Sequence, residues 1–283
     1  MDLREKLIVE PGKRVRLKDI DPNFSGNHTS EIEARSDLEK NVARLTRLQE
    51  ALYAEKKHAV LIVLQGIDAA GKDGTCWHVM TAMNPQGTTV TPFKQPTETE
   101  LAHDFLWRVH PHAPGRGQIA VFNRSHYEDV LVVRVHGLVK KSVWSKRYDQ
   151  INAFEDLLVA SGTTILKFFL LISAEEQLAR FKERLDDPAK QWKISDGDYS
   201  ERERWDEYTK AYEAMLENCS TKRAPWFVIP SNRKWFRNLA ISTILADTME
   251  GLKMKLPAPT VDLADIRKQY EAAAEAAKRG KTR

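Results

Sequence analysis

A glycine-rich loop behind an apolar segment is the part of the chain best suited to chemistry. Residues 60–64 are all aliphatic, and residues 66–74 then read GIDAAGKDG. A strand, a loop of this kind ending in Gly-Lys and a following helix are the context of a phosphate-binding loop. Backbone N–H groups of the loop and of the first helical turn bind anions, and the Lys72 ammonium adds a mobile positive charge. The segment therefore predicts a site for phosphate groups.

The residue after the lysine departs from the usual pattern. Phosphate-binding loops ordinarily carry Ser or Thr there, whose hydroxyl binds Mg²⁺, whereas this chain has Asp73. Another side chain must then hold the metal, and Asp68 lies inside the loop. A carboxylate among phosphates repels them unless a divalent cation lies between. We therefore expect a metal–phosphate substrate, contacted by Gly66, Asp68, Ala69, Ala70, Gly71, Lys72, Asp73 and Gly74.

A second polar cluster follows another apolar segment. Residues 117–122 predict a buried strand, and residues 123–129 read NRSHYED. Because the carboxyl ends of parallel strands meet at one edge of a sheet, this cluster should lie beside the phosphate loop. Arg124 could bind a phosphate bidentately, and Glu128 or Asp129 could bind Mg²⁺ directly or through water. The two motifs together predict phosphoryl transfer, which needs positioning, a metal and positive charge.

A charged segment separates the last two apolar segments. Residues 173–225 are predicted to be helical and are rich in Lys and Arg. The segment starts at the carboxyl end of a strand, where open α/β folds bind ligands, so we expect it to close over phosphates as a lid. Arg180 and Arg184 share a helix face and suit a long polyanion or a nucleoside triphosphate. Further candidate phosphate contacts are Lys94, Arg134 and Lys193.

Some of these residues have an ordinary structural interpretation as well. Asn123 or Ser125 could cap a helix that carries acidic residues in its first turn. We expect His126 to pack or form hydrogen bonds, because phosphoryl transfer here needs no histidine. The lid cations could belong to a solvated helix face. Trp192 and Trp205 could stack on a base or pack within the lid, and we expect packing.

Apolar segments alternate with helical patterns along the chain, which predicts an α/β fold with a mostly parallel sheet covered on both faces. The five predicted strands are 59–65, 88–93, 117–122, 163–172 and 226–229. Predicted helices span about 30–57, 72–83, 97–110, 144–160 and 261–278, with an apolar helix after residue 129. We expect one domain over residues 1–283, with an N-terminal arm and long helix (1–57), the inserted lid (173–225) and a C-terminal helix with a basic tail (256–283).

The composition is that of a globular protein, with 283 residues of which 42% are hydrophobic and 30% charged. No apolar run approaches the ~18 residues of a membrane span, and no charged-then-apolar leader is evident. A net charge of +4 permits an anionic substrate without requiring nucleic acid. The two cysteines, Cys76 and Cys219, suit a reducing compartment. We therefore expect a cytoplasmic protein that binds neither membranes nor nucleic acids.

The motifs together resemble those of the type-2 polyphosphate kinases. The matching segments are residues 66–74, 122–128 (FNRSHYE), 187–193 (DPAKQWK) and 224–226 (APW), within a resemblance that covers about residues 10–255. The resemblance implies a three-layer α/β/α sandwich of the P-loop kinase kind, akin to thymidylate kinases, with a helical lid. It also implies phosphate transfer between inorganic polyphosphate and nucleotides with Mg²⁺ or Mn²⁺.

The resemblance also implies roles for the matching residues. Asp68 would be a metal-coordinating or catalytic acid, and Lys72 a phosphate binder. The path of the polyphosphate would be lined by Arg124, Arg180 and Arg184.

Asn123 stands where many members of that family have Asp. An amide cannot carry the charge of a carboxylate, so Glu128 is the alternative second metal ligand beside Asp68. Asn123 followed by His-Tyr-Glu-Asp is similar to the third subclass, whose members act on nucleoside mono- and diphosphates. The implied reaction is therefore reversible phosphate transfer from polyphosphate to AMP and ADP, forming ADP and ATP.

Two other functions share these sequence features. An ATP-dependent nucleoside monophosphate kinase would have the same fold and loop, but Asp73 in place of Ser or Thr argues against it. A non-catalytic sensor of nucleotide or polyphosphate is disfavoured by Lys72 and the acidic residues around it. The helical arms at both ends favour a homo-oligomer, a dimer or a tetramer.

Overall fold

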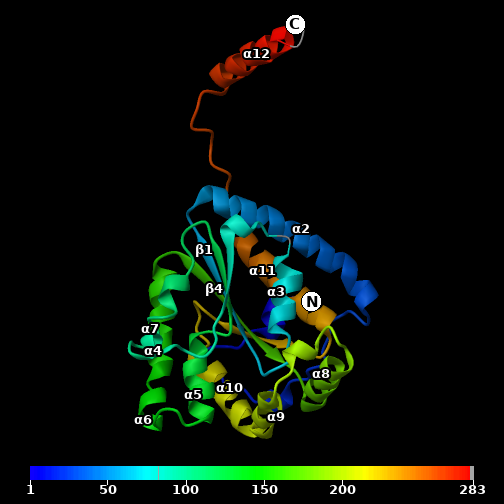
Figure 1. Ribbon diagram of the computed structural model, residues 1–283, viewed down its shortest axis with the longest axis vertical. Helices are drawn as coiled ribbons and strands as arrows, with labels where there is room; N and C mark the ends of the chain where they lie inside the picture. Colours follow the sequence, from blue (N-terminus) through cyan, green and yellow to red (C-terminus); the bar gives the residue numbers. More distant parts are fainter. Residues whose placement is uncertain (82, 281–283) are drawn as a thin grey trace.

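The sheet of this computed structural model is built from five parallel strands (Figure 1). The structure describes residues 1–81 and 83–280. The strands are β1 (Ala59–Gln65), β2 (Thr88–Pro92), β3 (Ile119–Asn123), β4 (Thr163–Leu171) and β5 (Trp226–Pro230). They lie in the order β2-β3-β1-β4-β5, with each neighbouring pair parallel. The predicted sheet is confirmed, with strand ends that differ by one or two residues.

β1 lies in the middle of the sheet, and both of its faces are apolar. All seven of its residues are buried. Alternating side chains of a strand point to opposite faces. Leu61 and Val63 accordingly belong to one hydrophobic cluster, and Val60, Ile62 and Leu64 belong to another. A core on each side of the sheet makes the predicted three-layer α/β/α sandwich.

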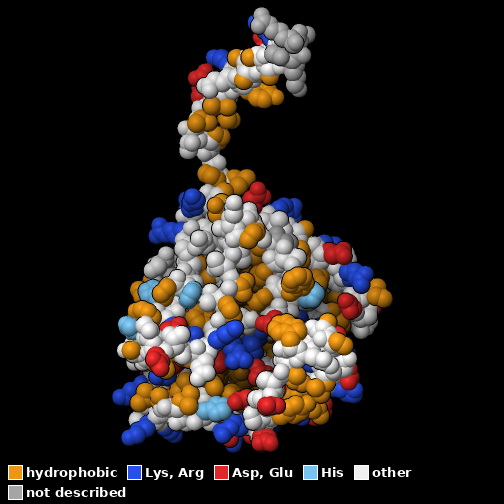
Figure 2. Space-filling model, in the orientation of Figure 1, with side chains coloured by type: hydrophobic (Ala, Val, Ile, Leu, Met, Phe, Trp, Pro, Cys, Tyr) orange, Lys and Arg blue, Asp and Glu red, His pale blue; other side chains and the backbone are white. Residues whose placement is uncertain are grey.

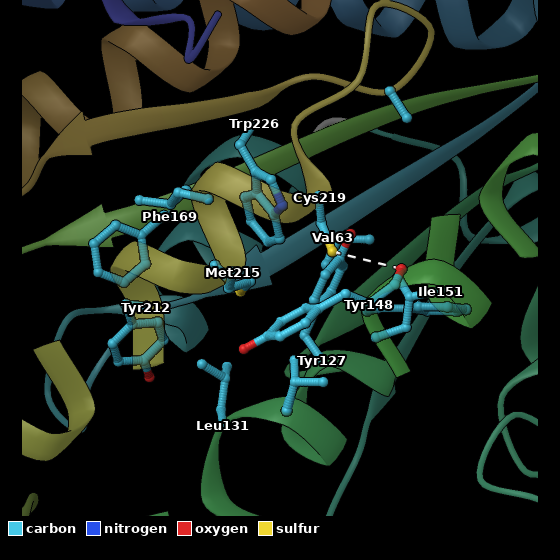
Figure 3. Packing of buried hydrophobic residues seen from close by; sticks show 14 of the residues in the cluster. Val63, Tyr127, Leu131, Tyr148, Ile151, Phe169, Tyr212, Met215, Cys219 and Trp226 are labelled. Carbon is cyan, nitrogen blue, oxygen red and sulfur yellow. Dashed lines mark hydrogen bonds between the residues drawn. The ribbon is translucent and has the colours of Figure 1, made fainter. Parts of the chain in front are cut away.

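Different helices cover the two faces. The face of Val60 is covered by α2 (Glu31–Glu55), α3 (Lys72–Met80) and α11 (Lys234–Gly251). The opposite face is covered by α5 (Val132–Val135), α7 (Arg147–Ala160) and α10 (Trp205–Cys219). Figure 3 shows part of this second core, where Phe169 of β4 and Trp226 of β5 lie near Met215 and Tyr212 of α10.

α11 is an element that the sequence analysis did not predict. Eleven of its 18 residues are buried, because it packs against α2, α3 and the sheet at once. A helix that is apolar on most sides lacks the one-sided period that identifies a surface helix. Two residues of this helix, Lys234 and Arg237, also line the cleft described below.

Only the first turn of the predicted helix over 97–110 forms. α4 spans Glu98–Leu101. The Asp104 carboxylate then accepts a hydrogen bond from Leu106 N at 3.0 Å, which stabilises a turn in competition with the helix. A short 3-10 helix, η3 (His110–His112), ends the segment. The prediction was therefore wrong beyond the first turn.

The chain between β3 and β4 is also more broken than predicted. In place of a continuous apolar helix after residue 129 there is a 3-10 helix, η4 (His126–Val130), followed by the single turn of α5. Ser125 caps η4, since its hydroxyl accepts from Tyr127 N at 3.2 Å. The predicted helix over 144–160 is α7, preceded by a separate turn, α6 (Lys141–Trp144).

The segment after β4 is helical, as predicted. α8 (Ala174–Asp186) is capped by Ser173, and η5 (Gln191–Lys193) and α9 (Asp196–Glu203) follow. α10 then returns to the sheet and buries Met215 and Leu216 in the core. Within residues 173–225, the part that borders the cleft described below is therefore α8 to α9, and α10 belongs to the helical layer.

The two ends of the chain behave differently. The N-terminal arm contains α1 (Leu3–Leu7) and η1 (Leu17–Asp19), and it pairs with β5 through a bridge between Ile8 and Phe227. α12 (Leu263–Gly280) projects from the body on an extended segment (Figure 1). Residues 281–283 of the predicted basic tail lie outside the described residues.

A short 3-10 helix, η2 (Pro85–Gly87), precedes β2. None of the helices in residues 1–81 and 83–280 is long and apolar enough to cross a membrane.

Candidate active site

The phosphate loop runs from the end of β1 into the first turn of α3. Gly71 precedes this turn at φ +105°, in the region that favours glycine. A Cβ at Gly71 would overlap the Arg237 guanidinium, and a Cβ at Gly74 would lie 3.1 Å from Arg237 Nη2. The two glycines therefore allow an arginine of α11 to approach the loop backbone closely.

Lys72 is buried, and its ammonium turns back into the loop. Nζ donates to Gly66 O at 2.6 Å and to Ile67 O at 3.3 Å. Burial lowers the pKa of Lys72, and the nearby Arg124 cation lowers it too, while neighbouring carboxylates oppose this shift. Lys72 also lines the cleft over the loop, so it can exchange the two carbonyl oxygens for phosphate oxygens.

The end of β3 meets the loop, as predicted. Arg124 Nη2 donates to Asp68 Oδ1 at 2.8 Å, and Asn123 Nδ2 donates to Asp73 Oδ1 at 2.7 Å. Arg124 has a φ of +62°, which is uncommon for a residue other than glycine. Backbone strain of this kind collects at functional sites. Each carboxylate of the loop is thus held by a donor from the second motif.

Glu128 and Asp129 do not line the cleft. Glu128 Oε1 accepts from Gln65 Nε2 at 3.1 Å. Burial raises the pKa of Glu128, against an opposing effect of Arg124. The Asp129 carboxylate accepts from Arg147 Nη1 at 2.7 Å. The carboxylates that face the cleft at the loop are those of the loop itself, so the metal role predicted for Glu128 would require its side chain to move.

A buried polar network anchors the second motif. Lys167 Nζ donates to Glu155 Oε2 at 2.5 Å, to Tyr127 Oη at 2.9 Å and to Cys219 O at 2.6 Å. Tyr127 Oη donates to Glu155 Oε1 at 2.7 Å, and His126 Nε2 lies 3.3 Å from the same oxygen. Burial lowers the pKa of His126. The predicted structural role of this histidine is confirmed.

A cleft with two lobes opens over the loop. The basic lobe has a volume of about 550 Å³, and the second lobe has a volume of about 470 Å³. Both lobes are lined by Asp68, Asp73, Arg124, Arg184 and Lys193. The basic lobe adds the cations Lys72, Lys94, Arg180, Lys190, Lys234 and Arg237. The second lobe adds Trp192, Ser195, Gly197, Asp198 and Glu201. Figure 2 shows Lys and Arg side chains gathered in a hollow on this face.

Arg180 lines the basic lobe, but its nitrogens are engaged by the protein. Nη1 donates to Ala69 O at 2.8 Å and to Ala70 O at 3.0 Å. Nη2 donates to Ser231 O at 2.5 Å and to Asn232 O at 3.1 Å. The side chain is buried and fastens α8 to the phosphate loop and to the end of β5. This geometry gives Arg180 a positioning role in place of the predicted contact with polyphosphate.

Of the other predicted lid and edge residues, Lys94, Arg184 and Lys193 line the cleft, whereas Arg134 does not. Arg134 Nη1 donates to Tyr148 Oη at 3.2 Å, and its guanidinium lies 4.7 Å from the ring centroid of Trp144. These aromatic partners hold Arg134 away from the loop. The expected packing of Trp192 is wrong, because the side chain is 78% exposed at the rim of the second lobe.

Arg237 and Lys234 are cleft residues that the sequence analysis missed, whereas Lys190 belongs to the basic lid segment that it identified. Arg237 is 2% exposed. Its Nε and Nη2 donate to Asn238 Oδ1, and no carboxylate of the described residues pairs with it. Burial and the nearby Arg180 lower the pKa of Arg237 to about 10. Residues 232–238 read NRKWFRN, so Arg237 is one of several polar residues there and its spacing in the sequence did not distinguish it.

The oxygen donors at the loop suit Mg²⁺ or Mn²⁺. Asp68 and Asp73 both face the cleft. Among the residues that the structure describes, no group of three or more His, Cys, Asp or Glu side chains could hold a metal ion by itself. Mg²⁺ is commonly bound by one or two carboxylates together with substrate phosphates and waters. The residues present therefore fit a cation that binds together with phosphates.

Comparisons with known proteins agree with this geometry. The family model described as Polyphosphate kinase 2 (PPK2) matches residues 28–257. An AMP/ADP-polyphosphate phosphotransferase from Meiothermus ruber is 52% identical, over 90% of this chain and 96% of the relative. An ADP-polyphosphate phosphotransferase from Rhodopseudomonas palustris is 46% identical, over 85% of this chain and 86% of the relative.

Among solved structures, polyphosphate kinase 2 from Arthrobacter aurescens TC1 superimposes with a TM-score of 0.92 at 42% identity. The match covers 96% of this chain and 97% of that chain. The matched family region contains the loop, the second motif and the lid. The chain therefore belongs to the polyphosphate kinase 2 family.

Proposed function

We propose that the protein transfers the terminal phosphate of inorganic polyphosphate to AMP and to ADP, forming ADP and ATP. The observation that carries this proposal is the cleft with two lobes that meet at Asp68, Asp73 and Arg124. A donor and an acceptor that each occupy one lobe would meet at the phosphate loop. The printed names of the Meiothermus and Rhodopseudomonas relatives, which specify AMP/ADP and ADP, support this choice of substrates.

The basic lobe suits the polyphosphate. Its cations come from the loop, from α8 and the segment after it, and from α11, so they can follow a chain of phosphates. The second lobe suits the nucleotide. It has the exposed ring of Trp192, which can stack on a base, and the polar side chains of Ser195, Asp198 and Glu201, which can bond to a ribose or a base.

The chain's own residues do most of the work in this reaction by positioning and by charge. Asp68 and Asp73 would hold the Mg²⁺ or Mn²⁺ ion, which supplies charge neutralisation on the transferred phosphoryl group. Lys72 exchanges Gly66 O for phosphate oxygens, and Arg124 exchanges Asp68 for a phosphate. The loop N–H groups and the start of α3 bind the remaining oxygens.

The attacking oxygen belongs to the terminal phosphate of AMP or ADP. This oxygen is already ionised at neutral pH, so the reaction does not need a strong general base. Asp68 would serve to hold the cation beside the acceptor phosphate and would not need to remove a proton. Asn123 donates to Asp73, and so keeps this carboxylate turned toward the cleft without adding a further negative charge.

The experiment that tests this proposal offers AMP and ADP separately to the purified protein, with Mg²⁺ and either long-chain polyphosphate or ATP as the donor. The proposal predicts ATP from AMP by way of ADP when polyphosphate is the donor. ATP from ADP alone would reject the AMP activity. Turnover of AMP with ATP only would instead identify an ATP-dependent nucleoside monophosphate kinase, and tight binding without any product would identify a sensor.

We also propose that the protein forms a homo-oligomer, a dimer or a tetramer, in the cytoplasm. α12 supports the oligomer, because Leu263, Ile266 and Tyr270 are 61%, 45% and 72% exposed on a helix that does not pack on the body. Cys76 and Cys219 are both free, which suits a reducing compartment. Light scattering on the full chain and on a variant that ends at residue 256 tests the first statement, and cell fractionation tests the second.

A further inference from the structure

The basic lobe contains a carboxylate that its metal chemistry does not explain. Three acidic side chains line this lobe: Asp68, Asp73 and Glu183. The first two belong to the phosphate loop, where a cation can separate them from phosphates. Glu183 lies on α8, among the cations of the lid. A carboxylate there repels a polyanion, so its presence needs a separate reason.

Glu183 joins two cations that come from different parts of the chain. Lys190 Nζ lies 2.6 Å from Glu183 Oε1 and 3.1 Å from Asp187 Oδ2, whereas Lys234 Nζ lies 2.9 Å from Glu183 Oε2. Of the two carboxylates that pair with Lys190, only Glu183 lines the lobe. Lys190 precedes η5 in the lid, whereas Lys234 is the first residue of α11 in the body. The three side chains are between 42% and 54% exposed, so a ligand in the lobe can reach them. The two lysines also lower the pKa of Glu183 to about 2.

We infer that Glu183 is an internal counter-ion that polyphosphate must displace from Lys190 and Lys234, and that it thereby limits the affinity of the basic lobe for long chains. The inference rests on the proposed function. With the lobe free of polyphosphate, Glu183 keeps the two lysines paired and links the lid to the body. A polyphosphate that extends along α8 replaces it, because a phosphate chain offers both lysines several charged oxygens at once.

Position along α8 makes this effect depend on chain length. Arg180 of α8 contacts the loop carbonyls of Ala69 and Ala70. Glu183 follows three residues later, about 4.5 Å further along the helix axis at about 1.5 Å per residue. Pyrophosphate bound at the loop should therefore be less sensitive to Glu183 than a long chain, which continues past it.

The test is a direct titration of polyphosphate and pyrophosphate into wild-type protein and into the Glu183→Gln variant. An exposed ion pair changes an equilibrium by about 1.4- to 5-fold. Since polyphosphate exchanges two such pairs, Glu183→Gln should bind long chains about 2- to 25-fold more tightly. The slope of log affinity against log salt should steepen by about 0.7–0.9, because one further phosphate is neutralised.

Asp186→Asn is the matched control. Asp186 lies on the same helix, pairs with Lys182 at 2.5 Å and is 62% exposed, but it does not line the lobe. Its substitution removes the same charge and should leave the affinity within twofold. In the background of Lys190→Met and Lys234→Met, adding Glu183→Gln should give no gain in affinity over the double variant, and this comparison isolates the counter-ion effect from any loosening of the lid.

Equal or weaker binding of long chains by Glu183→Gln, with Asp186→Asn unchanged, would overturn the inference and leave Glu183 as a structural link. An equal gain for pyrophosphate and for long chains would also overturn it, since the effect would then lie at the loop. If the wild-type protein binds no polyphosphate, the proposed function fails and the inference fails with it. Binding without nucleotide turnover contradicts the proposed function alone, because the titration does not depend on turnover.

Discussion

Replacement of Lys167 by Met should reduce the free energy of unfolding by about 3–5 kcal/mol, because it leaves a buried carboxylate without its cation. Lys167 Nζ lies 2.5 Å from Glu155 Oε2, and neither side chain is more than 2% exposed. Met is of similar length and shape to the apolar part of Lys, so lost packing contributes little. The loss of the ion pair should therefore dominate.

The pH dependence of this loss has a definite sign. Burial alone raises the pKa of Glu155, but Lys167 and His126 outweigh burial and lower it. Without Lys167, burial should raise the pKa of the folded state above that of the unfolded state. The variant should then lose stability as the pH rises through the raised pKa, so the difference from the wild-type protein should be larger at pH 8 than at pH 5.

Urea unfolding followed by tryptophan fluorescence at both pH values measures these differences. The control is Glu155→Gln in the Lys167→Met background, which replaces the isolated charge with a neutral amide and should recover about 1–3 kcal/mol. A loss below about 1 kcal/mol, or a double variant no more stable than the single one, would refute the view that this pair holds the second motif in place.

Three further predictions follow from the loop and its surroundings. Gly71→Ala should cost about 2 kcal/mol or more in stability and abolish turnover, because it combines φ +105° with overlap of Arg237; Gly251→Ala, which meets nothing within 4 Å, is its control in urea unfolding and turnover assays. Arg237→Met should weaken polyphosphate binding at least tenfold while raising the free energy of unfolding by about 1 kcal/mol, since it removes a buried cation that has no carboxylate partner among the described residues. A loss of stability in urea unfolding together with the loss of affinity in the titration would contradict this. Burial raises the pKa of Asp129 to about 6. The free energy of unfolding should therefore fall, by at most about 3 kcal/mol, as the pH rises from about 4 to 6 and Asp129 ionises. Asp129→Asn should remove this pH dependence, and urea unfolding curves that keep it would count against the reasoning.

The phosphate loop, the five strands and the second motif could be predicted because their signals are local. A run of buried aliphatic residues identifies β1, and the glycines with Lys72 identify the loop. The parallel order of strands then brings Asn123 and Arg124 to the same edge. Local sequence patterns, with the rule that the carboxyl ends of parallel strands meet at one edge of a sheet, were sufficient to predict this half of the site.

The rest depended on contacts that sequence spacing does not reveal. α11 is apolar on most sides, so neither the helix nor Arg237 on it was predicted. Arg180 and Arg184 have the same spacing signal, yet the carbonyls of the loop engage Arg180 while Arg184 faces the cleft. Glu128 has the carboxylate expected of a metal ligand, but its side chain is bonded to Gln65 and does not line the cleft. Such differences come from tertiary packing, which fixes which nitrogen or oxygen remains free.

The most direct test of the central claim compares ATP formation from ADP and long-chain polyphosphate by the wild-type protein and by Asp68→Asn, with polyphosphate affinity measured in parallel. Asp68 lies where the two lobes meet. The account predicts ATP from the wild-type protein, and for the variant no measurable turnover with only a modest loss of polyphosphate affinity. Turnover by Asp68→Asn close to that of the wild-type protein would contradict it.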